Sequence, residues 1–359
     1  MASLKLLVVS TPMGPLGKGL GGGVELTLEA VLESLYRRGH ALSLVAAEGS
    51  QLPKTPLQQC WLESGVPQPS WQHQSRSAPV QIPFDGLLPR FWQRAFSEQH
   101  AFDAVLNLGY DWLPLWLTPE FQTPLFHLVS MGSVGEAMDA VIESIACAFP
   151  AQLAFHTASQ AADFDLSEPP TLLANGFDFG RYDFCAEPEP CLAWVGRIAP
   201  EKGLEDAAKV AAAQQWPLRV WGLKEDPAYA AAVEASVPPG TIEWRGFLPT
   251  EQLQRELGQC AVMLNTPKWN EAFGNVVVEA MACGVPVVAY QRGGPAELIE
   301  EGVTGYLVPP DQPQALLEQL PAALALDRQS CRRQAERRFG LEAFGARLEA
   351  WIKKTGATA

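Results

Sequence analysis

Short apolar runs alternate with amphipathic stretches along most of the chain. The first series of apolar runs covers residues 5–10, 42–46, 104–108, 125–129 and 153–156. A second series covers residues 192–195, 218–221, 242–244, 262–265, 287–289 and 306–308. Such short continuous runs are typical of parallel strands buried on both faces, with the amphipathic stretches between them forming the covering helices. The pattern predicts an α/β fold with two parallel sheets.

The expected helices follow from apolar positions repeated every three to four residues. Val24, Leu28, Val31, Leu32 and Leu35 share one helical face, and Gly39 is a stop signal. In the second series we expect helices at 203–214, 228–236, 251–258, 275–283 and 295–301. The tail from about 327 to 354 is predicted to be wholly helical, with an apolar stripe that must dock. Residues 49–97 are rich in Gln, Ser and Pro and are predicted to be a long irregular, functional segment.

The domain boundary is expected where prolines and acids replace the strand and helix pattern, in residues 177–190. We predict a first Rossmann-like domain over 1–176, completed by a tail helix over 336–359, and a second Rossmann-like domain over 177–335. The length of 359 residues is ample for two hydrophobic cores.

Composition restricts the partners. The chain has 26 Lys and Arg against 40 Asp and Glu, and the net charge of -14 argues against nucleic acid or an anionic membrane surface as a partner. The N-terminal residues lack the layout of a signal peptide and no run of about 18 apolar residues occurs, so we expect a cytoplasmic protein without stable membrane association. The seven cysteines form no CxxC pair, which suggests neither a disulfide framework nor a zinc site.

The strongest chemical signal is a pair of carboxylates, Glu271 and Glu279, separated by seven residues. The first lies in a loop after an apolar run and the second lies in the following helix, which starts near Gly274. The amides of Phe273, Gly274 and Asn275 at this helix start suit a pyrophosphate or sugar hydroxyls. Two carboxylates nearby are better explained as acceptors for hydroxyl groups than as phosphate ligands, although two solvated helix carboxylates are the alternative.

The second signal is the segment from Gly196 to Gly203, which follows the first strand of the second series. Arg197 and Lys202 fall where the carboxyl ends of parallel strands place ligands. Two cations near a helix start predict a local anion site in this acidic protein. A surface ion pair with Glu201 is the alternative for this segment.

These two elements, together with the motifs Asn-Gly-Phe-Asp at 175–178 and Gly-Gly-Pro-Ala-Glu-Leu-Ile at 293–299, resemble the GT-B glycosyltransferases and, within them, the retaining glycosyltransferase family 4. The resemblance implies two Rossmann-like domains facing a cleft, with a C-terminal helix crossing back to the first domain. It implies that Glu271 contacts the transferred sugar and Glu279 the ribose. It also implies that Arg197 and Lys202 neutralise the leaving diphosphate, so that neither a metal nor a cofactor is needed.

The same resemblance assigns roles in the first domain. Gly22 and Gly23, in a Gly-rich loop, would approach the donor phosphates, and a purely structural turn is the alternative. His127 matches the place where related enzymes have a catalytic side chain lining the cleft near the sugar. A packed, hydrogen-bonded strand histidine is the alternative reading of His127.

A further set of motifs resembles the UDP-glucose:tetrahydrobiopterin glucosyltransferases. These are Thr-Pro-Met-Gly-Pro-Leu-Gly at 11–17, Gly-Gly-Gly-Val-Glu-Leu-Thr at 21–27, Tyr-Asp-Trp-Leu-Pro-Leu at 110–115, His-Leu-Val-Ser-Met-Gly-Ser at 127–133 and Thr-Pro-Lys-Trp at 266–269. The resemblance implies UDP-glucose as donor and a pterin as acceptor, both small molecules.

A pterin needs a carboxylate for its donor edge and an aromatic surface for its ring. The candidates are Glu25 and Asp111 as acids and Tyr110 and Trp112 as rings. A helix cap at Glu25 and a turn at Asp111 are the alternatives. For the whole chain, three other functions stay open: transfer to another sugar, lipid or small molecule, a UDP-sugar epimerase on the same fold, and a silent sugar-nucleotide binding protein.

Overall fold

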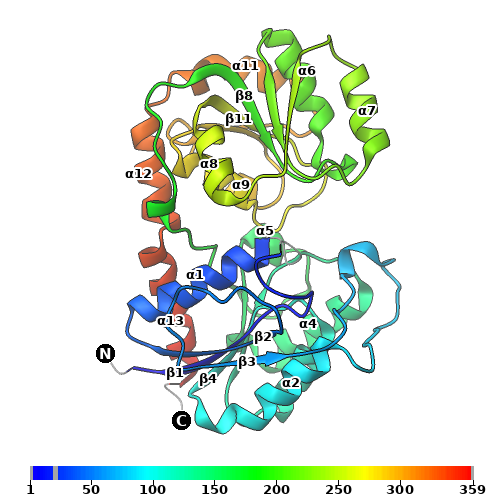
Figure 1. Cartoon of the computed structure of the whole chain (residues 1–359), viewed down its shortest axis with the longest axis vertical. Coiled ribbons are helices and arrows are strands. Elements are labelled where there is room, and N and C mark those ends of the chain that lie inside the picture. The colour runs from blue at the N-terminus through cyan, green and yellow to red at the C-terminus, as the bar shows by residue number, and fades with distance from the viewer. Residues whose placement is uncertain (1–2, 19–22, 357–359) are drawn as a thin grey trace. The chain divides into compact units, whose positions relative to one another are not determined.

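The computed structural model of the protein describes residues 3–18 and 23–356 and contains two compact units (Figure 1). The N-terminal unit comprises Met1–Gly176 and Leu341–Ala359, and the C-terminal unit comprises Phe177–Gly340. The boundaries predicted from the sequence lie after residues 176 and 335, whereas the chain passes from one unit to the other after residues 176 and 340.

Within the described residues, the N-terminal unit contains one sheet of seven parallel strands in the order β3-β2-β1-β4-β5-β6-β7. Its strands are β1 (Lys5–Val9), β2 (Ala41–Ala47), β3 (Gln59–Glu63), β4 (Ala104–Asn107), β5 (Leu125–Val129), β6 (Leu153–Phe155) and β7 (Thr171–Leu172). Its helices are α1 (Gly23–Arg37), α2 (Leu87–Glu98), α3 (Trp112–Leu117), α4 (Glu136–Ala148), α5 (Ala158–Ala161) and α13 (Leu341–Gly356).

The central strand β1 shows why the apolar runs are continuous. Leu6 and Val8 pack in one core cluster, which also includes side chains of α1 and α13. Leu7 and Val9 pack in a second cluster with α2. Since successive side chains of a strand point to opposite faces, both faces of β1 are covered, and its four buried positions, 6–9, are all apolar.

The C-terminal unit contains, in the part of the chain that the structure describes, a sheet of six parallel strands in the order β10-β9-β8-β11-β12-β13. The strands are β8 (Glu189–Val195), β9 (Leu218–Trp221), β10 (Ile242–Gly246), β11 (Cys260–Asn265), β12 (Val287–Tyr290) and β13 (Gly305–Val308). The helices are α6 (Leu204–Gln214), α7 (Pro227–Ala235), α8 (Thr250–Gly258), α9 (Asn275–Ala282), α10 (Pro295–Leu298), α11 (Pro313–Leu324) and α12 (Arg328–Phe339). The predicted α/β class with two parallel sheets is confirmed.

The prediction of a wholly irregular segment over residues 49–97 is wrong. Strand β3 and helix α2 both lie in it. Strand β3 is an edge strand with half-exposed side chains, so its apolar signal is weak. In α2, however, Leu88, Phe91, Trp92 and Ala95 are buried at helical spacing. That stripe was visible in the sequence, although the Pro-rich and Gln-rich residues before it concealed it.

The tail is also not one helix. Helix α12 ends at Phe339 and α13 begins at Leu341, with Gly340 in an extended conformation (φ −60°, ψ 154°) between them. Gly340 forms a parallel β-bridge with Phe177, and the Phe177 amide donates to the carbonyl of Phe339. This pairing within the C-terminal unit takes the place of the next helical turn. The expected helix at 295–301 is likewise shorter and covers Pro295–Leu298.

Helix α13 belongs to the N-terminal unit and packs on α1. Phe344, Leu348 and Trp351 of α13 are buried in the cluster that also contains Leu32 and Leu35 of α1. The apolar stripe predicted for the tail is therefore part of the first core. None of the helices in the described ranges is both long and apolar enough to cross a membrane.

Both strand orders contain a switch point, where consecutive connections run in opposite directions. In the N-terminal unit it lies between β1 and β4, and in the C-terminal unit between β8 and β11. Open parallel sheets bind ligands outside the carboxyl ends of the strands at this point. The loops after these four strands are therefore where each unit is expected to bind a ligand.

Candidate functional site

The loop after β8 carries the first predicted cation, Arg197. Its Nη1 lies 2.6 Å from Oε2 of Glu225 and its Nη2 lies 2.9 Å from Oε1 of Glu201. The ion pair with Glu201, which the sequence analysis held as the alternative, is thus present, and Glu225 adds a second one. The guanidinium remains partly exposed at the switch point of the C-terminal unit.

The second cation, Lys202, contacts the first residue of the carboxylate pair. Its Nζ donates to both carboxylate oxygens of Glu271, at 2.7 and 3.0 Å. The same Nζ lies 4.9 Å from the centre of the Trp269 ring, within cation–π range. The structure therefore brings together a diphosphate candidate and a sugar candidate that are 69 residues apart in sequence. Trp269, which was assigned no role from the sequence, thus contacts the same ammonium group as Glu271.

Backbone contacts join the two loops that carry these residues. The Lys268 amide donates to the Glu201 carbonyl at 2.8 Å, and the Thr266 hydroxyl donates to the Gly203 carbonyl at 2.8 Å. Gly203 has a positive φ of 68°, and an added Cβ would lie 2.0 Å from the Thr266 carbonyl oxygen. Glycine is required at position 203 because this close approach leaves no room for a side chain.

Helix α9 begins directly after the loop that carries Glu271. Gly274 precedes it in a left-handed conformation with φ 94°. The ring of Phe273 is buried against Phe177 and Phe339, with centroid distances of 6.4 and 6.0 Å. The Phe273 ring is therefore enclosed in the C-terminal unit, and a ligand contact through its backbone amide stays a prediction. Asn275 opens the helix, whose positive dipole end is directed to the loop.

Glu279 lies in the second turn of α9 and is buried, with an exposed fraction of 5%. Burial raises the pKa of its carboxyl group to about 7, opposed by a hydrogen bond from Tyr182 and by the charge of Arg181. The Tyr182 hydroxyl donates to Oε1 at 3.4 Å. The alternative of a solvated helix carboxylate is wrong for Glu279, because its side chain is enclosed by the C-terminal unit.

The catalytic role expected of His127 is not supported. His127 is the third residue of β5 and is 1% exposed. Its Nδ1 lies 3.1 Å from Nδ2 of Asn107 and its Nε2 lies 2.8 Å from the Thr118 hydroxyl. Because the Asn107 amide nitrogen can only donate, Nδ1 is the acceptor and the Nε2 proton is donated to Thr118. Burial lowers the pKa of His127 to about 3, so the ring is neutral and fully engaged inside the unit.

Three segments meet at the switch point of the N-terminal unit. A Cβ at Gly109 would lie 3.2 Å from Cδ of Pro12, so the loops after β1 and β4 are in contact. The Gln68 amide donates to the Pro12 carbonyl at 2.9 Å. Residues 68–71 therefore join this site, although no motif in the sequence indicated it.

Two acceptor candidates are enclosed at this point. Asp111 is 3% exposed, and the Trp71 indole N–H donates to its Oδ1 at 3.2 Å. Burial raises the pKa of Asp111 to about 8, although hydrogen bonds from Trp71 and Gln68 lower it in part. The Tyr110 hydroxyl donates to the Gly132 carbonyl at 3.0 Å. The expectation that Asp111 offers an open carboxylate to a ligand is wrong, because it is buried and mainly protonated at pH 7.

The other acceptor candidates stay accessible. Trp112 is half-buried and stacks on the exposed Trp116 with ring centroids 5.5 Å apart and an interplanar angle of 19°. Glu25 is half-buried in the first turn of α1, and its Oε2 accepts a hydrogen bond from the Gly17 amide at 2.8 Å. Gly23 begins α1 and is exposed, whereas Gly22 lies outside the described residues.

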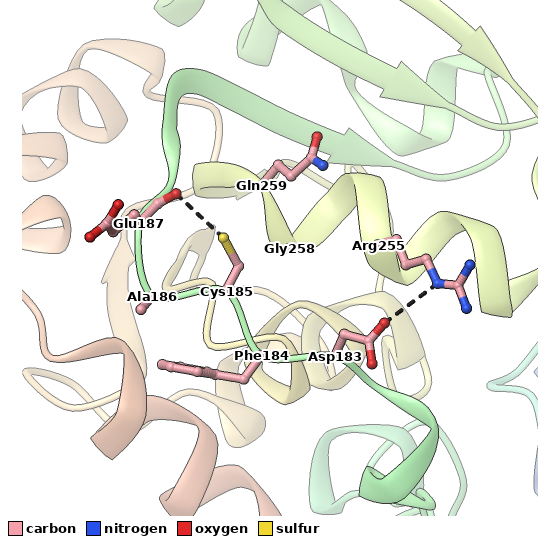
Figure 2. Close-up of a pocket in the computed structure, with 8 residues that line it drawn as sticks. All are labelled: Asp183, Phe184, Cys185, Ala186, Glu187, Arg255, Gly258 and Gln259. Atoms are coloured by element: carbon pink, nitrogen blue, oxygen red, sulfur yellow. Dashed lines mark hydrogen bonds and ion pairs between the residues drawn. The ribbon is translucent and has the colours of Figure 1, made fainter.

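A shallow pocket of about 580 Å³ lies at the opposite end of the C-terminal sheet (Figure 2). It is lined by the segment before β8 and the end of α8, so it adjoins the amino ends of β8 and β11. Figure 2 shows the Cys185 thiol donating to the Glu187 carbonyl and an ion pair between Arg255 and Asp183. None of the predicted site residues lines this pocket.

Solved structures define the class of fold. Anabaena Alr3699/HepE in complex with UDP and glucose is similar with a TM-score of 0.72 and 20% identity, covering 98% of this chain and 100% of that chain. AviGT4, a glycosyltransferase involved in avilamycin A biosynthesis, is similar with a TM-score of 0.72 and 19% identity, covering 99% of both chains. The two α/β units, each built on a parallel sheet, have the GT-B glycosyltransferase fold.

Within that class, residues 185–338 match the family model described as glycosyl transferases group 1. Over 140 residues the chain is 31% identical to D-inositol 3-phosphate glycosyltransferase of Nocardia farcinica, covering 33% of this chain and 29% of that protein. Over 130 residues it is 36% identical to alpha-maltose-1-phosphate synthase of Mycolicibacterium smegmatis, covering 33% of each. The alignments thus span a third or less of these relatives' lengths.

Proposed function

We propose that this protein is a glycosyltransferase that transfers glucose from UDP-glucose to a small acceptor with retention of the anomeric configuration. The observation that carries the proposal is the grouping of Arg197, Lys202, Glu271 and the start of α9 at one switch point. The match to the group 1 family over this unit supports the same activity. The complex of a similar fold with UDP and glucose supports the donor class.

The proposed chemistry is electrostatic. As the anomeric bond weakens, negative charge accumulates on the departing diphosphate, and Arg197, Lys202 and the positive end of α9 stabilise it. Glu271 accepts hydroxyl groups of the sugar once Lys202 turns to the phosphate. Glu279 accepts the ribose hydroxyls and is a stronger acceptor when it is ionised. Side chains and helix amides thus carry the charge that a metal ion carries in other transferases.

For the acceptor we propose a pterin or a similarly flat, nitrogen-rich ring. The stacked pair of Trp112 and Trp116 offers an exposed indole face next to the N-terminal switch point. Glu25 supplies the carboxylate that a paired N–H edge requires, in place of the enclosed Asp111. Asp111 then holds Trp71 in position and does not contact the ligand.

The test is a product analysis. The purified protein is incubated with UDP-glucose labelled in the sugar, and with a panel of reduced pterins, simple sugars, inositol phosphate and a lipid acceptor. Mass spectrometry is expected to find a hexose added to pterins, and NMR of the product is expected to show the α configuration of the donor. Transfer of hexose to other acceptors, with none to pterins, would refute the proposal of a pterin acceptor. It would leave the proposal of a glycosyltransferase standing.

Two outcomes separate the rival functions. Conversion of UDP-glucose into an isomeric UDP-sugar without an acceptor would identify an epimerase. Binding of UDP-glucose without UDP release, in the presence of every acceptor, would identify a silent binding protein. Arg197→Ala serves as the control variant, because any genuine turnover at this site must fall when its cation is removed.

A further inference from the structure

Glu225 is an acidic side chain at the donor site that belongs to none of the motifs described above. It lies after β9, and its Oε2 is 2.6 Å from Nη1 of Arg197. Glu201 meets Nη2 of the same guanidinium at 2.9 Å. The two terminal nitrogens of Arg197 are those that grip a phosphate in bidentate fashion. Two carboxylates therefore occupy the fork that a diphosphate would use.

The backbone places Glu225 at this position. The Ile198 amide donates to the Leu223 carbonyl at 2.9 Å, and the Asp226 amide donates to the Ile198 carbonyl at 3.2 Å. These reciprocal bonds join the loop after β9 to the loop that carries Arg197. Gly222 permits the approach, because a Cβ there would lie 1.8 Å from the Gly196 carbonyl oxygen. The contact between Glu225 and Arg197 is thus built into the fold of the C-terminal unit.

The charges explain what this contact does to a ligand. Arg197 carries one positive charge and its two partners carry one negative charge each, so the group has a net charge of -1. A diphosphate brought to Arg197 meets this negative charge and competes with the two carboxylates for the guanidinium. Both carboxylates are about one third exposed, so water can take over their solvation when they leave.

We propose that Glu225 is a displaceable counter-ion that competes with the donor diphosphate for Arg197. The inference rests on the proposed function, because it requires that Arg197 binds the diphosphate. Glu225 lowers the affinity for UDP and returns to Arg197 when UDP leaves, which favours product release. Release of product limits the turnover of many transferases, so a built-in competitor shortens the time that UDP stays bound.

The experiment compares UDP binding by calorimetry in wild type, Glu225→Gln and the matched control Glu234→Gln. Glu234 is an exposed residue of α7 in the same unit. Its substitution removes the same charge at a position that does not contact Arg197. Removing a partly exposed competing ion pair is expected to lower the Kd of UDP roughly two- to fivefold in Glu225→Gln. The control is expected to stay at the wild-type value, and inhibition of turnover by added UDP is expected to strengthen in Glu225→Gln.

A double variant tests the route of the effect. In the background Arg197→Ala, Glu225→Gln is expected to leave the Kd of UDP unchanged, since the contested cation is gone. Equal or weaker UDP binding by Glu225→Gln, with normal binding by wild type, would overturn the counter-ion role alone. Absence of UDP binding by the wild-type protein would overturn the proposed function and this inference with it.

Discussion

Replacement of Glu279 by Gln tests the protonation state of the buried carboxyl group in α9. Burial raises its pKa from 4.5 to about 7. A pKa difference of about 2.5 corresponds to ~3 kcal/mol of free energy. Between pH 4.5 and 7 the unfolded chain has lost this proton while the folded protein keeps it. Glu279 therefore lowers the free energy of unfolding progressively as pH rises through this interval, and by a constant amount above it.

Glu279→Gln keeps the shape of the side chain and removes the titration. Urea unfolding of both proteins at several pH values between 4.5 and 8 measures the difference in free energy between variant and wild type. This difference is expected to shift by ~3 kcal/mol in favour of the variant over that range. Comparing the two proteins at each pH cancels the other titrating groups. A difference independent of pH would refute the reasoning.

The same carboxyl group links UDP binding to pH. Ribose hydroxyls bind the ionised form better, so UDP binding is expected to release a proton from Glu279 near pH 7 and to strengthen as pH rises through this value. Calorimetry in buffers of different ionisation enthalpy measures the proton release. Glu279→Gln supplies the matched control, because the titration of the UDP phosphate is common to both. Equal proton release in both proteins would show that Glu279 does not respond to the nucleotide.

The remaining predictions concern four side chains and the metal requirement. Arg197→Ala and Lys202→Ala are each expected to lower kcat/KM on the order of a hundredfold, about 3 kcal/mol, with unchanged circular dichroism; near-normal turnover would contradict the donor site. Glu271→Ala is expected to lower kcat more than it weakens UDP binding, which steady-state kinetics and calorimetry separate. His127→Ala is expected to lose roughly 2–4 kcal/mol of stability in urea unfolding, because it leaves a cavity and removes one buried hydrogen bond each from Asn107 and Thr118. A variant that folds with wild-type stability but is inactive would instead support a catalytic role for His127. Turnover is expected to survive EDTA; a complete loss that Mg²⁺ or Mn²⁺ restores would overturn the charge assignment.

Much of the fold could be predicted because its signals are local. Strand β1 has four consecutive apolar residues, 6–9, and this run alone marks a strand covered on both faces. The edge strand β3 was missed because its half-exposed residues do not form a continuous apolar run. Gly340 shows a different limit. It interrupts the tail because residue 177 pairs with it, and a partner so distant leaves no trace in the local sequence.

In the candidate site, too, some residues could be predicted from local sequence and others could not. The residue types and their spacing indicated Arg197, Lys202, Glu271 and Glu279, because a strand, loop and helix in series place them at one edge of a sheet. Their partners could not be predicted. Glu225 reaches Arg197 only through the parallel pairing of β8 and β9, and Trp269 reaches Lys202 through the joined loops.

The sequence by itself determined the two parallel sheets, the order of the motifs and the chemical identity of the side chains in the candidate site. Only the tertiary structure decided which of these groups carry charge and which are exposed. His127 and Asp111 looked like functional residues in sequence, yet folding buries both among hydrogen-bonding partners and neutralises them at pH 7. The physical reason is that periodicity depends on neighbours along the chain, whereas desolvation and ion pairing depend on atoms that distant segments bring together.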